Sequence, residues 1–212
     1  MTHAPEPRKP TRKEKEQEFR LNLILDAAEE VFGETSFGGA SVEEIAQRAE
    51  ISVGTLYNLF RSKEDVYRAV VSRAQNIFFD RAEARFRAAR GPLEKVRAVV
   101  DTFFEHFHHY SRQFRLYASA TSGFDWELRS RLADEALQRQ AAFHRMITDC
   151  CQQGIDEGVF KRGVPAPILA TSILALPHPL LAFWLATEGT DLMAMIPHAR
   201  VLLDRLVGAD GN

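Results

Sequence analysis

The sequence predicts an all-α protein: an N-terminal helix-turn-helix domain of three helices, followed by a larger helical domain, with about nine helices in all. Three observations support this prediction. Apolar residues recur at helical spacing almost throughout the chain. Alternating β-branched segments bounded by turn residues are absent. Residues 42–61 have the pattern of two short helices that cross over a tight turn.

Composition and charge exclude several classes of protein. The chain has 212 residues and a net charge of −2, so any contact with nucleic acid must come from a local patch of charge. Its two cysteines, Cys150 and Cys151, are adjacent, which excludes a disulfide framework and favours a reducing compartment. The first twenty residues are basic and lack the apolar run of a signal peptide. We therefore expect a cytoplasmic protein.

The most apolar stretch, residues 168–186, contains Pro177, His178 and Pro179. It is only just long enough to span a bilayer, and we interpret it as a buried helix with no membrane partner. Both prolines lack an amide donor, which frees carbonyls near Ile173 and Ala175 and predicts a kink or a break. Those carbonyls could face a pocket, a water or a dimer contact.

The first helix is expected over residues 19–32, because its apolar positions share one face. The glycine-containing stretch 33–39 is expected to end it. Ser41 then stands at an N-cap with Glu44 three residues later, the pattern of a capping box. Two short helices should follow, over residues 42–49 and 52–60.

Ser62 is expected to cap the fourth helix, and Gly91-Pro92 should separate that helix from the next one. Pro197 is expected to kink the last helix. The buried stripe of the fourth helix should comprise Val66, Val70, Ala74, Ile77 and Phe78. Later helices are expected around residues 111–120, 125–153, 167–187 and 190–207.

The helix-turn-helix pattern requires apolar or small residues at fixed positions. Ala46 is small where the second helix must approach. Glu50 stands in the turn, where a left-handed backbone normally takes Gly or Asn, so we expect a strain of about 1 kcal/mol there. The inward-facing apolar set is Ile45, Ala49, Ile51, Leu56 and Leu59.

In the helix predicted over residues 52–60, the face opposite the apolar set carries Gly54, Tyr57, Asn58 and Arg61. A glycine inside a helix costs about 1 kcal/mol relative to alanine, but it allows close approach to a phosphate or a groove wall. Tyr57 offers a hydroxyl to a phosphate, and Asn58 can pair with an adenine edge. The candidate DNA-binding residues are Ser41, Ser52, Val53, Gly54, Thr55, Tyr57, Asn58 and Lys63.

Residues 52–60 contain no charged side chain, so an Arg or Lys contact to guanine cannot come from inside this helix. We expect Val53 and Thr55 to read thymine methyl groups. Any guanine contact is expected from Arg48 or Arg61. The basic residues of the N-terminal segment 8–20 could follow phosphates, or could simply be a solvated terminus.

Residues 18–78 resemble the DNA-binding domain of the TetR family. The residues that match the family's pattern are Ile45-Ala46, the GTLY at 54–57, Phe60 and Lys63. The resemblance implies an all-helical homodimer that dimerises through its two C-terminal helices, represses transcription at a double-stranded, palindromic DNA operator and is released by a small ligand. Leu59, where the family often has His or an aromatic residue, and Glu50 depart from the pattern. The expected organisation is a flexible basic arm at 1–17, a DNA-binding domain at 18–78 with its motif at 41–60, and a ligand-binding and dimerisation domain at 79–212.

Residues 101–126 are dense in aromatic side chains. These could be ordinary core, but together with nearby polar groups they predict a pocket for a small hydrophobic or amphipathic effector. The candidate effector-binding residues are Phe103, Phe104, Phe107, His108, Phe114, Tyr117, Trp126, Phe143, His178 and Trp184. Whether the effector releases DNA or promotes binding is left open.

Two other functions, an enzyme and a metal- or redox-responsive regulator, have weaker support in the sequence. Glu105-x-x-His108 is half of a di-iron motif without a second copy, so we predict no catalytic residue, no cofactor and no metal site. A metal- or thiol-redox-responsive regulator stays an alternative. It would use Cys150 and Cys151 with His106, His109 and His144.

Overall fold

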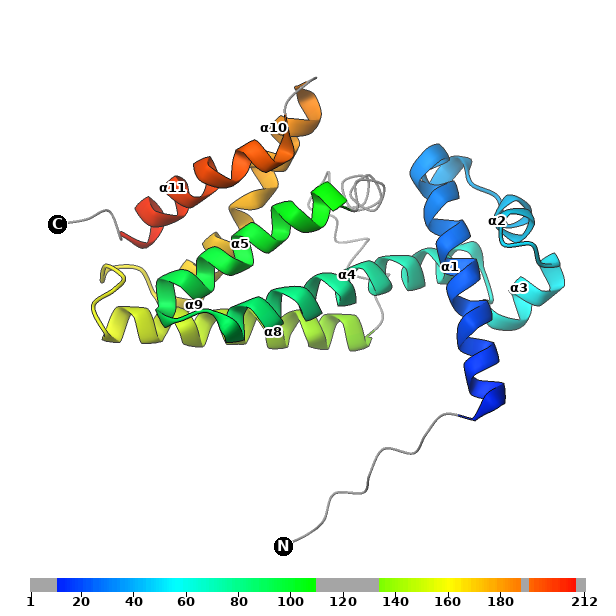
Figure 1. Cartoon of the computed structure of the whole chain (residues 1–212), viewed down its shortest axis with the longest axis horizontal. Helices are drawn as coiled ribbons and strands as arrows, with labels where there is room; N and C mark the ends of the chain where they lie inside the picture. The colour runs from blue at the N-terminus through cyan, green and yellow to red at the C-terminus, as the bar shows by residue number, and fades with distance from the viewer. Residues whose placement is uncertain (1–10, 110–133, 188–190, 209–212) are drawn as a thin grey trace, which may run out of the picture. The chain divides into compact units, whose positions relative to one another are not determined.

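The computed structural model describes residues 11–109, 134–187 and 191–208. Within these ranges the chain forms α-helices and one 3-10 helix, with no strand, which confirms the all-α prediction (Figure 1). The fold divides into two compact units, Met1–Val70 and Val71–Asn212. The boundary falls inside a single helix, α4 (Lys63–Ala88), which begins in the first unit and ends in the second.

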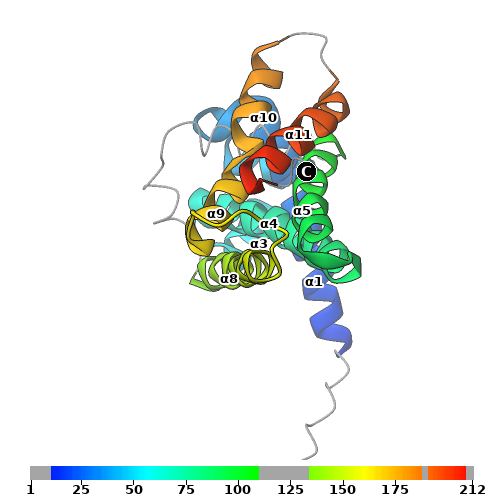
Figure 2. The same ribbon diagram turned by 90° about the vertical axis from the view of Figure 1, so that its left-hand side faces the viewer.

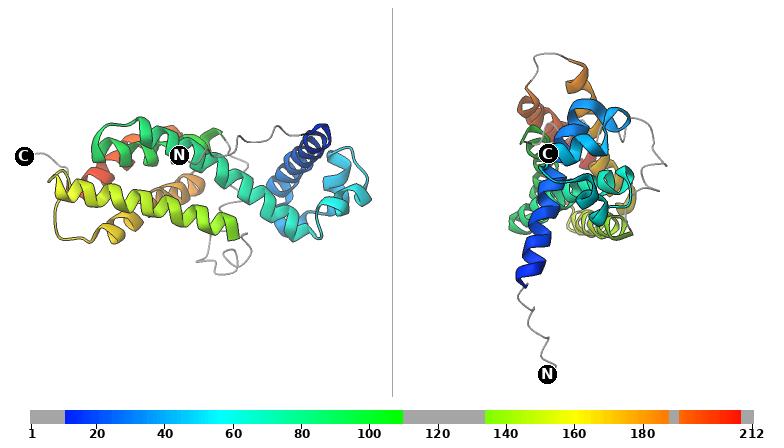
Figure 3. Two further views of the ribbon diagram at one scale, coloured as in Figure 1. Left: turned by 90° about the horizontal axis from the view of Figure 1, so that it is seen from below. Right: turned by 90° about the vertical axis from the view of Figure 1, so that its right-hand side faces the viewer.

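The first unit contains α1 (Arg12–Gly39), α2 (Val42–Arg48), α3 (Val53–Leu59) and the start of α4. Helices α2 and α3 lie on one flank of α1, as the left-hand view of Figure 3 shows. A small apolar core joins these elements. Its fully buried side chains are Ile24, Ala28, Val31, Ile45, Leu56 and Val66.

Helix α1 is longer at both ends than the sequence predicted. At its start, the Thr11 amide donates to Glu14 Oε2 at 2.5 Å and the Glu14 amide donates to Thr11 Oγ1 at 3.3 Å. This reciprocal cap starts the helix at Arg12, so residues 12–17 of the predicted flexible arm are helical. The bond from the Thr11 amide also lowers the pKa of the Glu14 carboxyl.

The predicted break at residues 33–39 is wrong, because α1 continues to Gly39. The ring of Phe37 packs against Phe32 at 5.9 Å and against Tyr67 at 5.0 Å between centroids. These contacts hold the last turns of α1 against α4. Tertiary packing therefore overrides the weak helix propensity of the glycines.

The second unit is built around α5 (Gly91–His109) (Figures 1 and 2). Helix α5 packs against α8, α9, α10 and α11. The predicted helix at 111–120 lies outside the described residues. The bounds are α8 Asp134–Asp156, α9 Ala166–Ala175, α10 Pro177–Ala186, the 3-10 helix η1 Leu192–Ala194 and α11 Met195–Val207.

The predicted break at Pro177 is confirmed, since α9 ends at Ala175 and α10 begins at Pro177. Pro197 does not kink α11, contrary to the prediction. It stands in the first turn of that helix, where an amide has no intrahelical acceptor to lose. The position of a proline along its helix therefore decides its effect.

The buried stripe of α4 shifts along the helix. Val66 and Val70 are buried as expected, whereas Ala74, Ile77 and Phe78 are only half-buried. Phe79, Ala82 and Phe86 are buried instead. The predicted stripe therefore holds in the first unit and rotates where α4 packs in the second.

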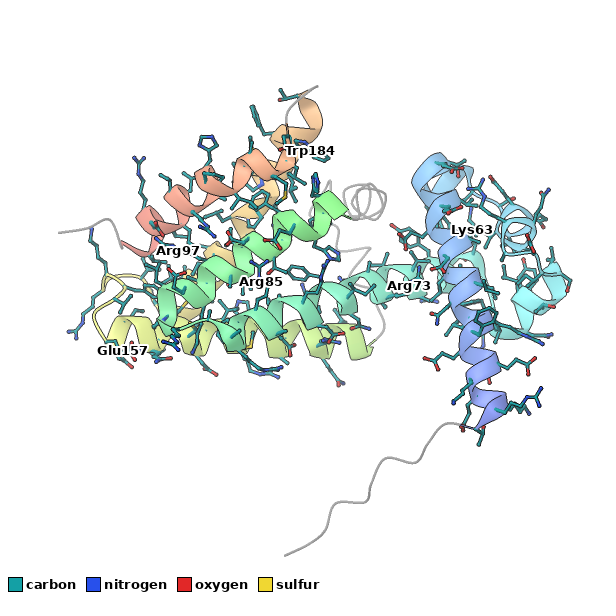
Figure 4. The ribbon with its side chains drawn as sticks, viewed as in Figure 1. Lys63, Arg73, Arg85, Arg97, Glu157 and Trp184 are labelled. Atoms are coloured by element: carbon teal, nitrogen blue, oxygen red, sulfur yellow. The ribbon has the colours of Figure 1, made fainter. Side chains whose placement is uncertain are left out.

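Two reciprocal ion pairs fasten α5 to α11. Arg97 on α5 donates to Asp204 on α11 at 3.0 and 2.5 Å, and Arg200 on α11 donates to Asp101 on α5 at the same two distances. Figure 4 shows Arg97 between the two helices. The hydrogen bonds to Asp204 and Asp101 raise the pKa of the Arg97 and Arg200 guanidinium groups. Each pair is bidentate, so together they fix how the helices align.

Among the described residues, the segment Ala166–Trp184 is long and apolar enough to cross a membrane, judged by length and composition only. About a third of its most apolar window is buried, and the break at Pro177 divides it. Its exposed side chains include Ile168 and Phe183. Core helices of other proteins pass the same test, so the segment gives little support for a membrane span.

Candidate functional site

The two helices of the predicted motif are held by serine caps. Ser41 Oγ accepts the Glu44 amide at 3.0 Å, and Ser52 Oγ accepts the Thr55 amide at 3.1 Å. The Ser52 and Thr55 hydroxyls also lie 2.8 Å apart. In the first cap, the Glu44 carboxylate lies 3.6 Å from Arg48. The cap hydroxyls thus set where α2 and α3 begin.

The turn between these helices adopts the expected left-handed conformation at Glu50, whose φ is 55°. Glu50 is the only non-glycine residue with positive φ in the part of the chain that the structure describes. The Ile51 amide donates to Ala46 O at 3.0 Å and the Glu50 amide donates to Gln47 O at 3.1 Å. This is the Schellman pattern of helix termination, which normally places glycine at this position.

Replacing Glu50 with glycine should raise the free energy of unfolding by about 1 kcal/mol, because glycine adopts positive φ without strain. Chemical denaturation would measure the change. Gln47→Gly, in the same short motif but at a helical position, serves as the control and should lose about 1 kcal/mol. Equal losses for both variants would show that Glu50 is not strained.

The outer face of α3 is exposed and uncharged. Tyr57 is 49% exposed, Asn58 and Gly54 are exposed, and Leu56 beneath them is fully buried. A Cβ added to Gly54 would meet only Ser52 Oγ, at 3.8 Å. The fold itself therefore does not require glycine at this position.

Two basic side chains that were predicted to contact DNA, Lys63 and Arg48, form hydrogen bonds and ion pairs within the first unit. The Lys63 ammonium donates to Phe37 O and Ala40 O, both at 2.9 Å, and lies 4.6 Å from the centre of the Phe37 ring (Figure 4). Arg48 contacts carboxylates at 2.9, 3.6 and 3.8 Å, and its hydrogen bond to Glu34 raises its pKa. Arg48 is therefore occupied by the fold, and Arg61 is the exposed arginine beside α3.

A group of rings, hereafter the ring cluster, lies in the second unit. Phe103 is 5.6 Å from Phe78, 4.6 Å from Phe107 and 5.3 Å from His178 between centroids. Phe143 is 6.0 Å from Phe78. The cluster comprises Phe78, Phe79, Phe103, His106, Phe107, Phe143 and His178.

The structure brings together four of the ten predicted effector residues, namely Phe103, Phe107, Phe143 and His178. Phe104 is fully buried 6.4 Å from Phe103, and Trp184 packs against the same core. His108 is exposed and does not belong to the cluster. Phe114, Tyr117 and Trp126 lie outside the described residues.

Sequence reasoning missed Phe78 and Phe79 as site residues. Both belong to α4, and Phe79 lies 4.9 Å from Phe143 between centroids. The predicted stripe of α4 included Phe78 but not Phe79, and it did not predict that their partners would be the aromatic residues of α5 and α8. The ring cluster therefore includes two residues of α4, the helix that begins in the first unit.

The thiols are buried rather than poised for chemistry. Cys150 and Cys151 are 4% and 0% exposed, and burial raises their pKa from 9.0 to about 11 and about 12. Among the described residues, no group of three or more His, Cys, Asp or Glu side chains could hold a metal ion. His144 instead pairs with Thr171 at 2.9 Å.

Because both thiols are stabilised in the neutral form, their contribution to stability is complete below pH 9 and is lost as the pH rises toward 11 to 12. Between these limits the free energy of unfolding should fall by about 1.4 kcal/mol per pH unit for each thiol. Denaturation at pH 9.5 and 10.5 would measure this slope. The Cys150→Ala, Cys151→Ala double variant isolates it from other titrations, and an unchanged slope would refute the prediction.

The chain resembles known regulators. Residues 24–70 match the family described as bacterial regulatory proteins, tetR family. The transcriptional activator FasR of Mycolicibacterium smegmatis is 34% identical over 97 residues, 46% of this chain and 44% of FasR. The transcriptional repressor KstR2 of Mycobacterium tuberculosis is 28% identical over 146 residues, 67% of this chain and 70% of KstR2. The chain thus spans less than half of FasR.

Solved structures share the fold. FadR of Bacillus subtilis, in complex with stearoyl-CoA, superposes with a TM-score of 0.76 at 22% identity, over 90% of this chain and 99% of FadR. AibR, in complex with isovaleryl coenzyme A and operator DNA, gives a TM-score of 0.69 at 19% identity, over 89% of this chain and 98% of AibR. FasR, KstR2 and FadR are all named as regulators of transcription. The match to the tetR family thus lies in the helix-turn-helix unit, and the likeness to FadR and AibR extends the shared fold over the helical second unit.

Proposed function

We propose that the protein is a homodimeric repressor that binds a palindromic operator through α3 and is released by a small, largely hydrophobic effector. The observation that carries the proposal is the exposed, uncharged face of α3 with its bare Gly54. The fold does not require a glycine at this position, but a glycine would allow a DNA duplex to approach the helix closely. The protein would act in the cytoplasm, where it meets the DNA.

In this proposal each residue of the α3 face has its own contact. Tyr57 donates to a phosphate and Asn58 pairs with an adenine edge. The methyl groups of Val53 and Thr55 contact thymine, and Ser41 and Ser52 place the starts of α2 and α3 against the backbone. Lys63 has three N–H donors, of which two carbonyls take two, so the third is available to a phosphate.

Dimerisation is supported by apolar side chains that are exposed on the last helices. Ile168, Phe183 and Val201 are 57%, 57% and 49% exposed. Leu202 and Leu206 extend this surface along α11. A palindromic operator requires two recognition helices related by a two-fold axis, and pairing these faces in a second copy would supply that axis.

The hydrophobic acyl part of the effector is proposed to contact the ring cluster, and the whole effector is proposed to be a CoA thioester. FadR and AibR, which share this fold, were solved with stearoyl-CoA and isovaleryl coenzyme A. A ligand among these rings would contact Phe78 and Phe79 directly. Both belong to α4, so the ligand would bias the position of the helix that begins at Lys63 in the DNA-binding unit.

The test combines mass measurement with titration of DNA from the protein's own promoter region. The proposal expects a dimer in solution, a footprint with two-fold symmetry and release by acyl-CoA. A monomer that ignores this DNA at low ionic strength would overturn it. Binding that strengthens with acyl-CoA would contradict release by the effector, and would mean that the effector promotes operator binding. Release by a metal or an oxidant would support the alternative regulator.

A further inference from the structure

A pocket of about 450 Å³ lies in the second unit and is lined by the end of α4, the start of α5 and one face of α8. None of its residues belongs to the α3 face, to the ring cluster or to the apolar surface proposed for dimerisation. Its volume is in the range of sites for small organic molecules. The lining residues are Phe86, Lys95, Ala142, Arg145, Met146, Asp149, Cys150 and Gln153.

The most buried residues of the pocket are apolar. Phe86 and Cys150 are 8% and 4% exposed, and Met146 is half-buried. The Cys150 thiol donates to Pro92 O at 3.7 Å, so its hydrogen bond is made to the start of α5. The inner surface of the pocket therefore gains free energy when an apolar group covers it.

Two basic side chains of the pocket lack an acidic partner. Lys95 Nζ lies 5.4 Å from the centre of the Phe86 ring, and Arg145 is exposed. Within the ranges that the structure describes, neither side chain forms an ion pair, in contrast to Arg200. The lining contains one carboxylate, that of Asp149, so it carries a net charge of +1. The pocket therefore combines an apolar inner surface with positive charge that the fold does not neutralise.

We propose that this pocket binds an amphipathic monoanion, that is, a carboxylate on a small hydrophobic body. The hydrophobic body would cover Phe86 and Met146, and the carboxylate would pair with Lys95 and Arg145. A ligand with several negative charges is disfavoured, because Asp149 repels them. The inference adds a second ligand site to the protein and does not depend on the proposed effector or on operator binding.

The test follows the methyl group of Met146 during titration with octanoate. Isotopic labelling of methionine methyl groups gives Met146 its own nuclear magnetic resonance signal, which is assigned by its loss in Met146→Leu. Octanoate should shift this signal to saturation. Octanol has the same chain length without the charge and should bind about tenfold more weakly. Equal binding of the two probes, or no shift with octanoate, would overturn the inference.

Substitutions locate the charge dependence in the pocket. The Lys95→Gln, Arg145→Gln double variant should bind octanoate about tenfold more weakly than the wild type and should bind octanol unchanged. The matched control is Lys161→Gln, Arg162→Gln, which removes two exposed charges outside the pocket and should leave octanoate binding unchanged. Arg145→Gln alone changes a single exposed side chain and should already weaken octanoate. Wild-type affinity in the double pocket variant would refute the assignment.

Coenzyme A separates the two kinds of anion that could enter the pocket. Its phosphates carry several negative charges, so it should shift the Met146 signal only at higher concentration than octanoate does. A tighter effect of coenzyme A would assign the pocket to the phosphorylated end of the proposed effector and would overturn the monoanion. The readout does not involve operator release, so failure of this inference is distinct from failure of the proposed function.

Discussion

Replacing Gly54 with alanine should stabilise the protein and weaken its operator complex. Alanine favours a helix over glycine by about 1 kcal/mol. The added Cβ meets only Ser52 Oγ at 3.8 Å, so the fold has room for it. The same methyl group stands on the exposed face of α3, where the duplex would approach. A loss of about 1.4 kcal/mol in each half-site would weaken a two-fold complex by ~100-fold.

Denaturation and operator titration of the same preparation would measure the two opposite effects. Gly38→Ala is the matched control. It adds a methyl group with nothing within 4 Å, in α1 rather than on the α3 face, and should leave operator affinity unchanged. Wild-type affinity in Gly54→Ala would mean that α3 does not lie close against DNA, and the proposed interface would fail with it.

The helix-turn-helix was predictable because its determinants are local. The capping serines, the turn at Glu50 and the buried Leu56 each follow from residues within one or two turns. The start of α1 was predicted seven residues too late, although Thr11 and Glu14 have the local spacing of a capping box. The end of α1 was not, because the rings that hold Phe37 come partly from α4.

For the candidate sites, the sequence predicted which residues share one face of a helix, but not which residues of other helices they contact. The exposed face of α3 followed from periodicity. The contacts of the long basic side chains could not be predicted from periodicity. Arg48 contacts Glu34, fourteen residues earlier, and Lys63 contacts carbonyls at the end of α1. Likewise Phe103 was predicted as an effector residue, but its neighbour Phe78 depends on which face of α4 meets α5. Periodicity identifies faces, and packing decides their partners.

Replacing Arg200 with alanine should lower the free energy of unfolding by about 3 kcal/mol, the usual cost of leaving a buried charge without its partner. The Asp101 side chain is 5% exposed and receives two hydrogen bonds from Arg200, at 3.0 and 2.5 Å. Removing the guanidinium strands a carboxylate inside the α5–α11 contact. Arg200→Lys should lose less, but should not recover fully, because an ammonium cannot make the bidentate pair.

The direction of the asymmetry tests the cause. Arg200 itself is 51% exposed, so Asp101→Ala lets the guanidinium return to water and should cost only about 1 kcal/mol. The double variant should then be more stable than Arg200→Ala alone, because the stranded charge is gone.

Arg97→Ala breaks the second pair, whose carboxylate on Asp204 is 20% exposed, and should also cost about 1 kcal/mol. All variants must be compared at one protomer concentration, since dimerisation would couple to stability. If Arg200→Ala costs no more than Arg97→Ala, burial of Asp101 does not determine the energetics of this contact.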